Sequence, residues 1–529
     1  MTSKAFSGSA GSRAIVIGAG VAGLAAAARL AQAGLHVTVL ERHSAPGGRM
    51  RTLPSAAGPV DAGPTVLTMR AVFDDLFQTL GTRLEDHVTL IPQHCIARHF
   101  WPDGSTLDLF DDEAKNADAI HAFAGARAAK QFHKFAHRAR RLFNGFDAPM
   151  MQAPAPSLPK LAMHVAARPW LIPDMAPTAT LAQLLDRSFD DSRLAQLFGR
   201  YATYVGGSPY EVPALLSLIW QAEAAGVWAV KGGMHQLACA LQSLANSKGV
   251  QFHYDADVSD VMVDAGRATG VRLTDGTIHT ANTVVFNGDP RALATGLLGK
   301  PATSVAPQTK RIPRSLSAEV WAFAATPNGP DLAYHNVFFR DQAKPEFDAI
   351  AQGRLVPDPT LYICAQDRAT GAAPPSVERF EIIANAAALT DMQSPEEFSR
   401  CQTRSFQTLA KFGLTFDPTP QKPALTTPQG FDTLFPATAG SLYGQSPHGT
   451  TAAFQRPTAR TPITGLYLVG GGTHPGAGVP MAALSARHAA EAILGDRTSP
   501  SRSRQTAMRG GISTGSAAPA TGPSASSDS

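Results

Sequence analysis

Cysteine is scarce in this chain of 529 residues, and the few cysteines are widely separated. They form no CxxC pair and show no metal-ligand spacing; they are Cys95, Cys239, Cys364 and Cys401. A disulfide framework and a structural zinc site both need several cysteines or histidines at short, characteristic spacings. The sequence therefore argues against a disulfide-rich protein, a zinc or other metal site, and a dithiol redox enzyme.

Long apolar runs are also absent. No stretch of ~18 uncharged apolar residues occurs, so we expect no transmembrane helix. Residues 1–12 are polar and lack the apolar core of a secretory signal, so we expect no signal peptide. We expect 1–12 to be a disordered arm, and 498–529, which is mostly Ser, Thr, Ala, Gly and Pro, to be a disordered tail. These features are typical of a soluble or peripheral protein in a reducing compartment.

Neither sign of charge is in large excess, since 46 Lys+Arg against 42 Asp+Glu leaves +4. The tail holds Arg502, Arg504 and Arg509 against Asp528, which is 3 − 1 = +2, and Lys4 adds one more. The rest of the chain is then 4 − 2 − 1 = +1. No basic patch is interleaved with stacking aromatics, so nucleic acid is not an expected partner.

A strand–turn–helix–strand pattern opens the ordered part of the chain. Residues 14–17 and 36–40 are β-branched apolar runs, and the alanine-rich stretch 24–33 between them predicts a helix. The turn after the first strand carries a GxGxxG motif formed by Gly18, Gly20 and Gly23. Such a βαβ unit binds dinucleotides, because the glycines let the backbone approach a pyrophosphate and the helix N-terminus stabilises its charge.

Glu41 ends the second strand, 41 − 23 = 18 positions after the last glycine. A carboxylate at this place accepts hydrogen bonds from ribose hydroxyls and disfavours a 2′-phosphate. The pattern therefore predicts FAD or NAD over NADP.

The remaining strands of this fold are far away in the sequence. We expect strands at 251–254, 258–263, 268–273, 283–286 and 465–469, with a last helix at 480–494. We therefore predict an α/β fold with α+β insertions: a discontinuous Rossmann-like FAD-binding domain and a second, substrate-binding domain. The predicted FAD-binding segments are 13–110, 231–300 and 456–497, and the predicted substrate and membrane-associated segments are 111–230 and 301–455.

Two further glycine-rich turns favour FAD. Gly47 and Gly48 allow a close bend, after which Arg49 can reach the pyrophosphate. The turn at 471–473 and the helix start at 479–481 offer free amides for negative charge on a reduced flavin. The predicted cofactor-binding residues are Gly18, Gly20, Gly23, Glu41, Gly48, Arg49, Gly63, Pro64, Thr65, Val258, Gly471, Gly472, Thr473, Val479 and Met481.

This set of motifs resembles the superfamily of FAD-containing amine oxidases and carotenoid desaturases, which are glutathione-reductase-type flavoproteins. The stretch 472–480 is similar to the C-terminal signature of bacterial carotenoid (phytoene-type) desaturases, and similarity runs from about residue 13 to 497. Residues 63–70 look more like the hydroxycarotenoid 3,4-desaturase (methoxyneurosporene dehydrogenase) branch, because the phytoene branch usually has Asp-Pro where Met69 and Arg70 stand.

The resemblance implies desaturation of an acyclic carotenoid, with hydride transfer to flavin N5 and with oxygen or a quinone as acceptor. No second GxGxxG unit occurs, so we expect no built-in NAD(P)H site. No cysteine lies in 402–529, so we expect FAD to be non-covalent. We name no catalytic residue; His474 and Asp147 are weak candidates, and a structural role for His474 is favoured.

Two segments suit an apolar substrate dissolved in lipid. Residues 149–177 combine seven prolines with methionines and Trp170, which forbids a long helix and suits either an adaptable apolar ligand surface or a loop packed on the core. Residues 127–146 form a basic amphipathic helix that either packs on the core or lies on an anionic bilayer. We expect a peripheral protein on the cytoplasmic side of a bacterial inner membrane.

Several other functions remain open on the same scaffold. They are a phytoene desaturase, another flavin oxidase such as an amine oxidase, a redox-neutral carotenoid isomerase, and a non-enzymatic lipid-binding protein. The complete glycine turn, Glu41 and the C-terminal helix motif speak against the last of these.

Overall fold

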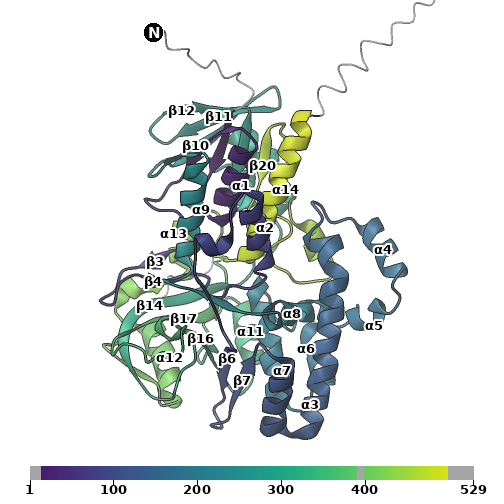
Figure 1. Cartoon of the computed structure of the whole chain (residues 1–529), viewed down its shortest axis with the longest axis vertical. Coiled ribbons are helices and arrows are strands. Elements are labelled where there is room, and N and C mark those ends of the chain that lie inside the picture. The colour runs from purple at the N-terminus through teal and green to yellow at the C-terminus, as the bar shows by residue number, and fades with distance from the viewer. Residues whose placement is uncertain (1–12, 390–397, 499–529) are drawn as a thin grey trace, which may run out of the picture.

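The computed structural model describes residues 13–389 and 398–498. Its two halves are each built on a β-sheet: a parallel sheet with helices in the upper half of Figure 1, and a large mixed sheet beside a group of helices in the lower half. The predicted α/β class with α+β insertions is confirmed. The predicted arm lies outside the described residues, and so does the predicted tail except for Thr498, which ends a helix.

The parallel sheet draws its strands from three distant parts of the chain. Its order is β20 (Leu466–Leu468), β13 (Thr283–Phe286), β1 (Arg13–Ile17), β2 (His36–Leu40) and β9 (Gln251–His253), and every neighbouring pair is parallel. The five strands predicted from apolar runs at these places are confirmed. Because all five strands run the same way, their carboxyl ends meet at one edge of the sheet.

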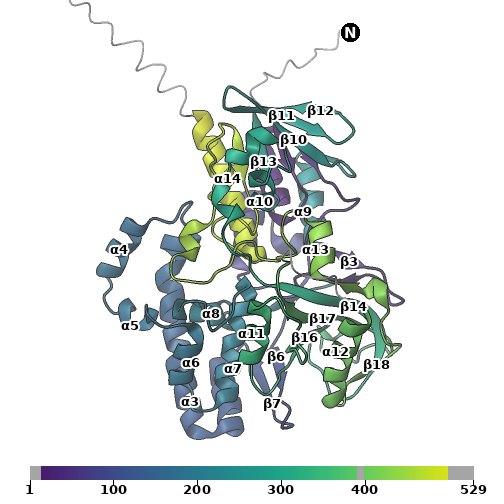
Figure 2. The same cartoon turned by 180° about the vertical axis from the view of Figure 1, so that it is seen from behind.

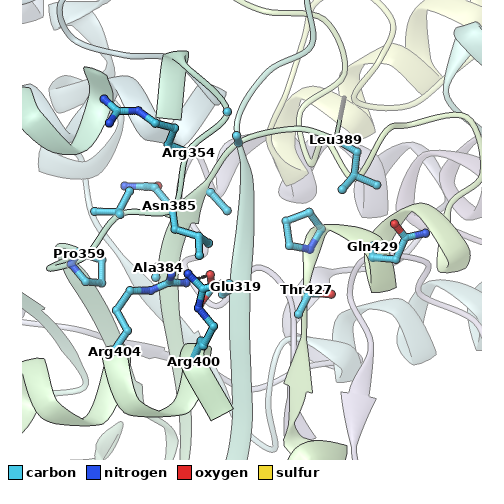
Figure 3. A pocket seen from close by; sticks show the side chains of 16 residues that line it. Glu319, Arg354, Pro359, Ala384, Asn385, Leu389, Arg400, Arg404, Thr427 and Gln429 are labelled. Atoms are coloured by element: carbon cyan, nitrogen blue, oxygen red, sulfur yellow. Dashed lines mark hydrogen bonds and ion pairs between the residues drawn. The ribbon is translucent and has the colours of Figure 1, made fainter. Parts of the chain in front are cut away.

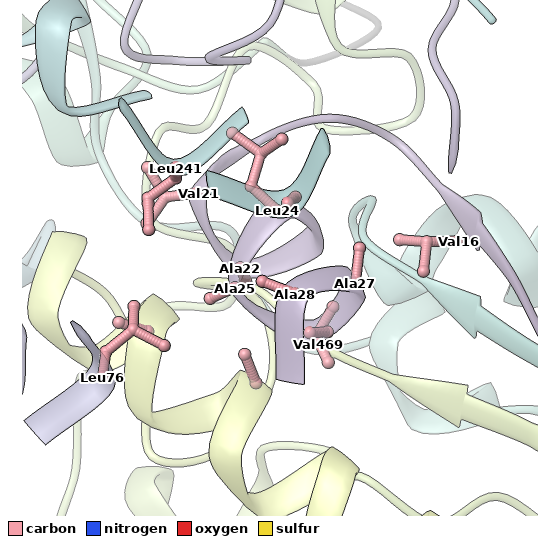
Figure 4. Close-up of a cluster of buried hydrophobic side chains, with 14 of the residues drawn as sticks. Val16, Val21, Ala22, Leu24, Ala25, Ala27, Ala28, Leu76, Leu241 and Val469 are labelled. Carbon is pink, nitrogen blue, oxygen red and sulfur yellow. The ribbon is translucent and has the colours of Figure 1, made fainter. Parts of the chain in front are cut away.

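Helices α1 (Val21–Gln32), α2 (Ala71–Thr79), α9 (His235–Ser247) and α14 (Val479–Thr498) pack into one core with this sheet. Figure 4 shows the alanines of α1 at the centre of this core, where small side chains let α14 approach closely. Helix α1 begins three residues before the predicted start, because Gly23 lies inside its first turn and Gly20 is its N-cap. The low helix propensity of glycine predicts a loop for this motif, but tertiary packing makes its second half helical.

Three smaller sheets accompany the parallel sheet and the mixed sheet. β10 (Val258–Asp264), β11 (Arg267–Leu273) and β12 (Ile278–Thr280) form an antiparallel sheet, which confirms the strands predicted at 258–263 and 268–273. The other two sheets are pairs, β3 (Thr52–Leu53) with β4 (Val60–Asp61) and β5 (Leu90–Pro92) with β8 (Trp228–Val230).

The second large sheet is mixed. Its order is β18 (Thr415–Asp417), β14 (Ser317–Asn328), β17 (Glu378–Ala386), β16 (Leu361–Ala365), β15 (His335–Phe338), β6 (Cys95–Phe100) and β7 (Thr106–Phe110), and β19 (Leu425–Thr426) pairs with β14. β6 and β7 fall inside the stretch 13–110 that the sequence assigns to the other domain. The division into two domains stays a prediction, and this pairing favours a first boundary ahead of Cys95.

Helix α3 (Glu113–Phe146) contains the predicted basic amphipathic stretch. Asp112 caps its start, and Gly125, with φ +87°, divides it into two helical segments that fold back on each other, so that Glu113 of the first pairs with Arg140 of the second. Its apolar side is buried: Phe132 and Phe135 pack in one core cluster, and Phe146 packs in another. This side is therefore not available to a bilayer, and the interpretation as a helix packed on the core describes it better.

The proline-rich segment forms two short helices, α4 (Leu158–Ala166) and α5 (Leu171–Met175), as the predicted absence of a long helix requires. Figures 1 and 2 show both helices projecting beside α3 at the flank of the molecule. The other helices are α6 (Leu181–Ser188), α7 (Ser192–Gly199), α8 (Ile219–Ala224), α10 (Pro290–Ala294), α11 (Lys344–Ala351), α12 (Phe398–Lys411) and α13 (Pro428–Leu434). Among the helices of residues 13–389 and 398–498, none combines the length and apolarity that a bilayer crossing requires.

Candidate cofactor-binding site

A cavity of about 530 Å³ opens where the carboxyl ends of the parallel strands meet. Residues that directly follow β1, β2 and β13 line it, as does Gly470 shortly after β20, and Val320 and Ile383 of the mixed sheet close it from the other half. Ligands of open α/β sheets bind at this edge. The predicted residues that line the cavity are Gly18, Gly20, Glu41, Gly48, Arg49, Gly63, Pro64, Val258, Gly471 and Val479.

The glycine turn between β1 and α1 has no room for side chains. Gly18 has φ +97°, and a Cβ on Gly23 would lie 2.1 Å from the Gly18 carbonyl oxygen. Gly23 therefore does not line the cavity but allows the turn to close against the helix. No side chain caps α1, and Val21 and Ala22 of its first turn line the cavity, so its first amides are available to an anion there.

Asn287, at the end of β13, holds this turn. Its side-chain amide donates to the carbonyl oxygens of Gly18 at 3.1 Å and Gly20 at 3.3 Å. The sequence motifs did not identify Asn287, although it directly follows the predicted strand 283–286. Its position at the shared edge of a parallel sheet was the available signal.

Glu41 is 4% exposed and both of its oxygens accept backbone hydrogen bonds. Oε2 accepts from the Ala19 amide at 2.6 Å, and Oε1 accepts from the His43 amide at 2.9 Å. A carboxylate has about four lone-pair positions, so both oxygens retain acceptor capacity for ribose hydroxyls. Val258 lines the cavity near this end.

The second glycine-rich turn places Arg49 in the cavity wall. Its guanidinium lies 5.0 Å from the centre of the Phe435 ring, and burial lowers the pKa of Arg49 from its ordinary value. Gly63 passes so close behind it that a Cβ there would lie 1.9 Å from the Arg49 carbonyl oxygen. Thr65 does not line the cavity, because its hydroxyl hydrogen bonds to the Tyr362 hydroxyl at 2.7 Å.

The C-terminal turn brings the start of α14 to the cavity. Gly471 and Val479 line it, whereas Gly472 packs against Pro290, Thr473 is buried and Met481 is half-buried outside the lining. The chain therefore faces the cavity at Gly470 and Gly471, turns away at 472–476 and returns to it at 477–479. The cofactor-binding role of all these residues stays a prediction.

Arg456 supports this turn and was not identified from the sequence. It is 8% exposed and donates to the carbonyl oxygens of Gly471 at 2.7 Å and Tyr443 at 3.1 Å. Burial lowers the pKa of Arg456 to about 10. No local pattern marks an arginine that bonds only to backbone carbonyls of distant turns.

Neither of the weak catalytic candidates, His474 and Asp147, lines the cavity. The Nε2 of His474 donates to the Ala153 carbonyl at 2.8 Å, and its ring stacks on His488. Asp147 follows α3 and accepts from the Gln152 amide at 2.9 Å. Both hydrogen bonds hold neighbouring segments of the chain together, which is the structural role favoured for His474.

A second cavity of about 260 Å³ contains none of the predicted residues. Figure 3 shows Arg400 and Arg404 of α12 directed toward Glu319 of β14, and Glu319 forms an ion pair with Arg404. Among the described residues, no group of His, Cys, Asp and Glu has the arrangement of a metal site.

FAD fits the main cavity on three observations. The turn before α1 offers amides for a pyrophosphate, Glu41 offers acceptors for a ribose, and the far wall is largely apolar, with Met50, Leu442 and Ile383 suited to a planar ring. None of the cysteines in the described residues lines the cavity.

Comparison with known proteins identifies the family of the chain. Residues 21–494 match the family model described as flavin containing amine oxidoreductase. A hydroxyneurosporene desaturase of Cereibacter sphaeroides is 56% identical over 92% of this chain and 98% of its own length. Another, of Rubrivivax gelatinosus, is 43% identical over 96% of this chain and 97% of its own.

Solved structures share the fold at low identity. A triple mutant of putrescine oxidase aligns with a TM-score of 0.60 at 14% identity, covering 92% of this chain and 98% of its own. Cyclohexylamine oxidase from Brevibacterium oxydans aligns with a TM-score of 0.56 at 18% identity, and the alignment covers 92% of this chain and 100% of the oxidase. These matches bear on the fold alone.

Proposed function

Because the chain belongs to the flavin containing amine oxidoreductase family, we propose that it is an FAD-dependent desaturase of an acyclic hydroxylated carotenoid in carotenoid biosynthesis. The observation that carries this proposal is its similarity, over almost the whole chain, to hydroxyneurosporene desaturases from three organisms. The bond desaturated is the 3,4 bond of a 1-hydroxycarotenoid.

Bound FAD supplies the acceptor for a hydride from the substrate. The chain's part is to hold and orient the two molecules. The amides before α1 bind the pyrophosphate, Glu41 binds the ribose, and the start of α14 stabilises negative charge beside Gly471. No cysteine within residues 13–389 and 398–498 lines the cavity, which supports non-covalent binding of FAD.

The far wall of the cavity, against which we place both the flavin ring and the reacting end of the polyene, is apolar. Val320, Ile383 and Leu442 face the site from the mixed sheet and the loop after it. Such walls exclude water and orient a polyene without titratable groups, and this fits a reaction in which the cofactor carries the difficult step. We propose oxygen or a quinone as the final acceptor, with no built-in NAD(P)H site.

We further propose peripheral association with the cytoplasmic side of a bacterial inner membrane, because the proposed substrate partitions into lipid. Exposed apolar side chains in α4 and α5 support this association. The basic side of the predicted amphipathic helix 127–146 gives weaker support to membrane association, because two of its arginines already pair with carboxylates of the protein. Arg141 pairs with Asp174, and Arg127 pairs with Asp190.

Pigment analysis tests the function. The chain is expressed in a strain that makes hydroxyneurosporene-type pigments, and the product is identified by mass and absorbance. We expect a red shift and the loss of two hydrogens. An unchanged double-bond number would indicate an isomerase or another oxidase, and activity only on phytoene would assign the phytoene branch. A purified protein unable to take up FAD would overturn the proposal.

A further inference from the structure

The projecting helices α4 and α5 carry most of the exposed large apolar side chains of the described residues. Seven such side chains are exposed within residues 13–389 and 398–498, and four of them lie between positions 158 and 172. Their exposed fractions are 56% for Leu158, 66% for Met163, 58% for Trp170 and 47% for Ile172. We call these four residues the apolar tip. Apolar side chains gathered in this way mark an interaction surface.

Helix α4 is attached to the protein by one side only. None of its nine residues is buried, although it is rich in apolar residues. Leu161 and Val165 pack partly against the cluster of Leu142, Phe146 and Leu171, while Leu158 and Met163 face outward. An amphipathic helix that lies on the protein by one side and exposes apolar residues on the other has the form of an interfacial membrane helix.

The charge of this region is positive. Residues 148–173 contain Lys160 and Arg168 but no Asp or Glu. The next acidic residue, Asp174, is buried and hydrogen bonded by Arg141, and the Asp174 backbone carbonyl accepts from Arg138. Cationic side chains beside exposed apolar ones complement an anionic lipid surface. Trp170 is of the residue type that membrane proteins place at the level of the headgroups.

The base of the projection touches the turn that borders the cofactor cavity. One contact joins residues 151–153 to this turn, since His474 Nε2 donates to the Ala153 carbonyl at 2.8 Å. Two more join them to the helix α14 that follows it: His488 Nε2 donates to the Met151 carbonyl at 3.1 Å, and Arg487 to the Gln152 side-chain oxygen at 2.7 Å. Ala477, Gly478 and Val479, which follow His474, line the cavity. The apolar tip is thus connected to the rim of the site by a short, anchored segment.

We propose that the apolar tip inserts into an anionic bilayer and that the polyene leaves the bilayer there, along residues 151–153, to enter the cofactor cavity. This inference rests on the proposed function for the identity of the substrate, but not for the membrane contact. It replaces the basic face of α3 by α4 and α5 as the part of the chain that enters the lipid.

Vesicle binding tests the contact. The full-length holoprotein is sedimented with vesicles of phosphatidylcholine alone or mixed with phosphatidylglycerol. We expect binding to the mixed vesicles and at least tenfold weaker partitioning for Met163→Ser/Trp170→Ser. The control is Ile278→Ser/Val377→Ser, whose side chains are also exposed but lie elsewhere; it should bind as the parent does. Equal loss in both double variants, or none in the first, would overturn the proposal.

Fluorescence locates the inserted residue. Of the five tryptophans, Trp101, Trp220 and Trp321 are buried and Trp228 is half-buried, so lipids with brominated acyl chains should quench Trp170 selectively. Trp170→Phe should keep vesicle binding and lose most of the quenching. Quenching that persists in Trp170→Phe would place the contact elsewhere. A fall from dimer to monomer in Trp170→Ser, with no change in vesicle binding, would instead assign the tip to a second copy of the chain.

Delivery is tested separately from chemistry. Met163→Ser/Trp170→Ser should turn over substrate embedded in vesicles at least tenfold more slowly, but should turn over detergent-dispersed substrate at the parent rate with unchanged FAD content. Equal loss with both substrates would overturn the delivery role. If the parent turns over neither substrate yet binds vesicles, the proposed function fails while the membrane contact stands.

Discussion

The side-chain amide of Asn287 donates a 3.1 Å hydrogen bond to the carbonyl oxygen of Gly18, joining the end of β13 to the turn that follows β1. The same amide reaches the Gly20 carbonyl. Two strands separated by more than 260 positions thus fix one glycine turn, and the amides at the start of α1 are oriented before any ligand binds. Such preorganisation removes part of the ordering cost of binding.

Asn287→Ala should weaken FAD binding. Each hydrogen bond contributes about 1 kcal/mol to holding the glycine turn in the form that binds FAD. Losing both should therefore raise the Kd of FAD by roughly 5- to 30-fold. Fluorescence titration of the apoprotein with FAD measures this change. Asn246→Ala, on the exposed end of α9, serves as the control and should leave the Kd unchanged. An unchanged Kd in Asn287→Ala would contradict the role of Asn287 in holding the turn.

Gly23→Ala should abolish FAD binding, because the new Cβ would lie 2.1 Å from the Gly18 carbonyl oxygen and 2.7 Å from the Asn287 amide nitrogen. The purified variant should be colourless. Gly495→Ala provides a matched helical glycine whose Cβ would have no neighbour closer than 3.9 Å. It should keep its flavin and gain up to about 1 kcal/mol of stability from helix propensity. A yellow Gly23→Ala protein would show that the turn can open.

Glu381→Gln should change how the stability depends on pH. Glu381 is fully buried, and burial raises the pKa of its carboxyl well above the ordinary value. Asp61 adds to this rise, while Arg51 and the Gly63 amide oppose it. The folded chain therefore keeps a proton that the unfolded chain releases, and stability falls as pH rises above the ordinary pKa of glutamate.

Glutamine removes this titration. The midpoint of thermal unfolding of Glu381→Gln should match the parent near pH 5 and exceed it by a few degrees near pH 8. The control is Asp118→Asn, on the exposed side of α3, and it should follow the parent at both pH values. A constant difference between Glu381→Gln and the parent across this range would mean that Glu381 stays ionised in the fold.

The local patterns of the sequence predicted the elements that build the site. Residues 14–17, 36–40 and 283–286 are apolar runs bounded by turns, and all three are strands of the parallel sheet. Short-range periodicity determines such elements, so they are predictable from one sequence. The glycine motif likewise marked the turn that closes against α1.

Contacts between segments far apart in the sequence could not be predicted from those local patterns. Asn287 and Arg456 act by bonding backbone carbonyls of distant segments, and neither is among the predicted cofactor-binding residues. The pairing of β6 with β15 is also a contact between distant segments. The periodicity of 127–146 predicted two faces correctly, but a buried core and a bilayer demand the same pattern, so only the packing of Phe132 and Phe135 distinguished them.

The central claim is that a flavin bound in this cavity takes a hydride from a hydroxylated polyene. Anaerobic mixing of the FAD-loaded protein with 1-hydroxyneurosporene in vesicles tests it most directly, with flavin and polyene absorbance followed together. The account predicts that the flavin bleaches in step with a red shift of the polyene, with one new double bond for each flavin reduced. A polyene that changes while the flavin stays oxidised, or a flavin that is not reduced by the polyene, would contradict it.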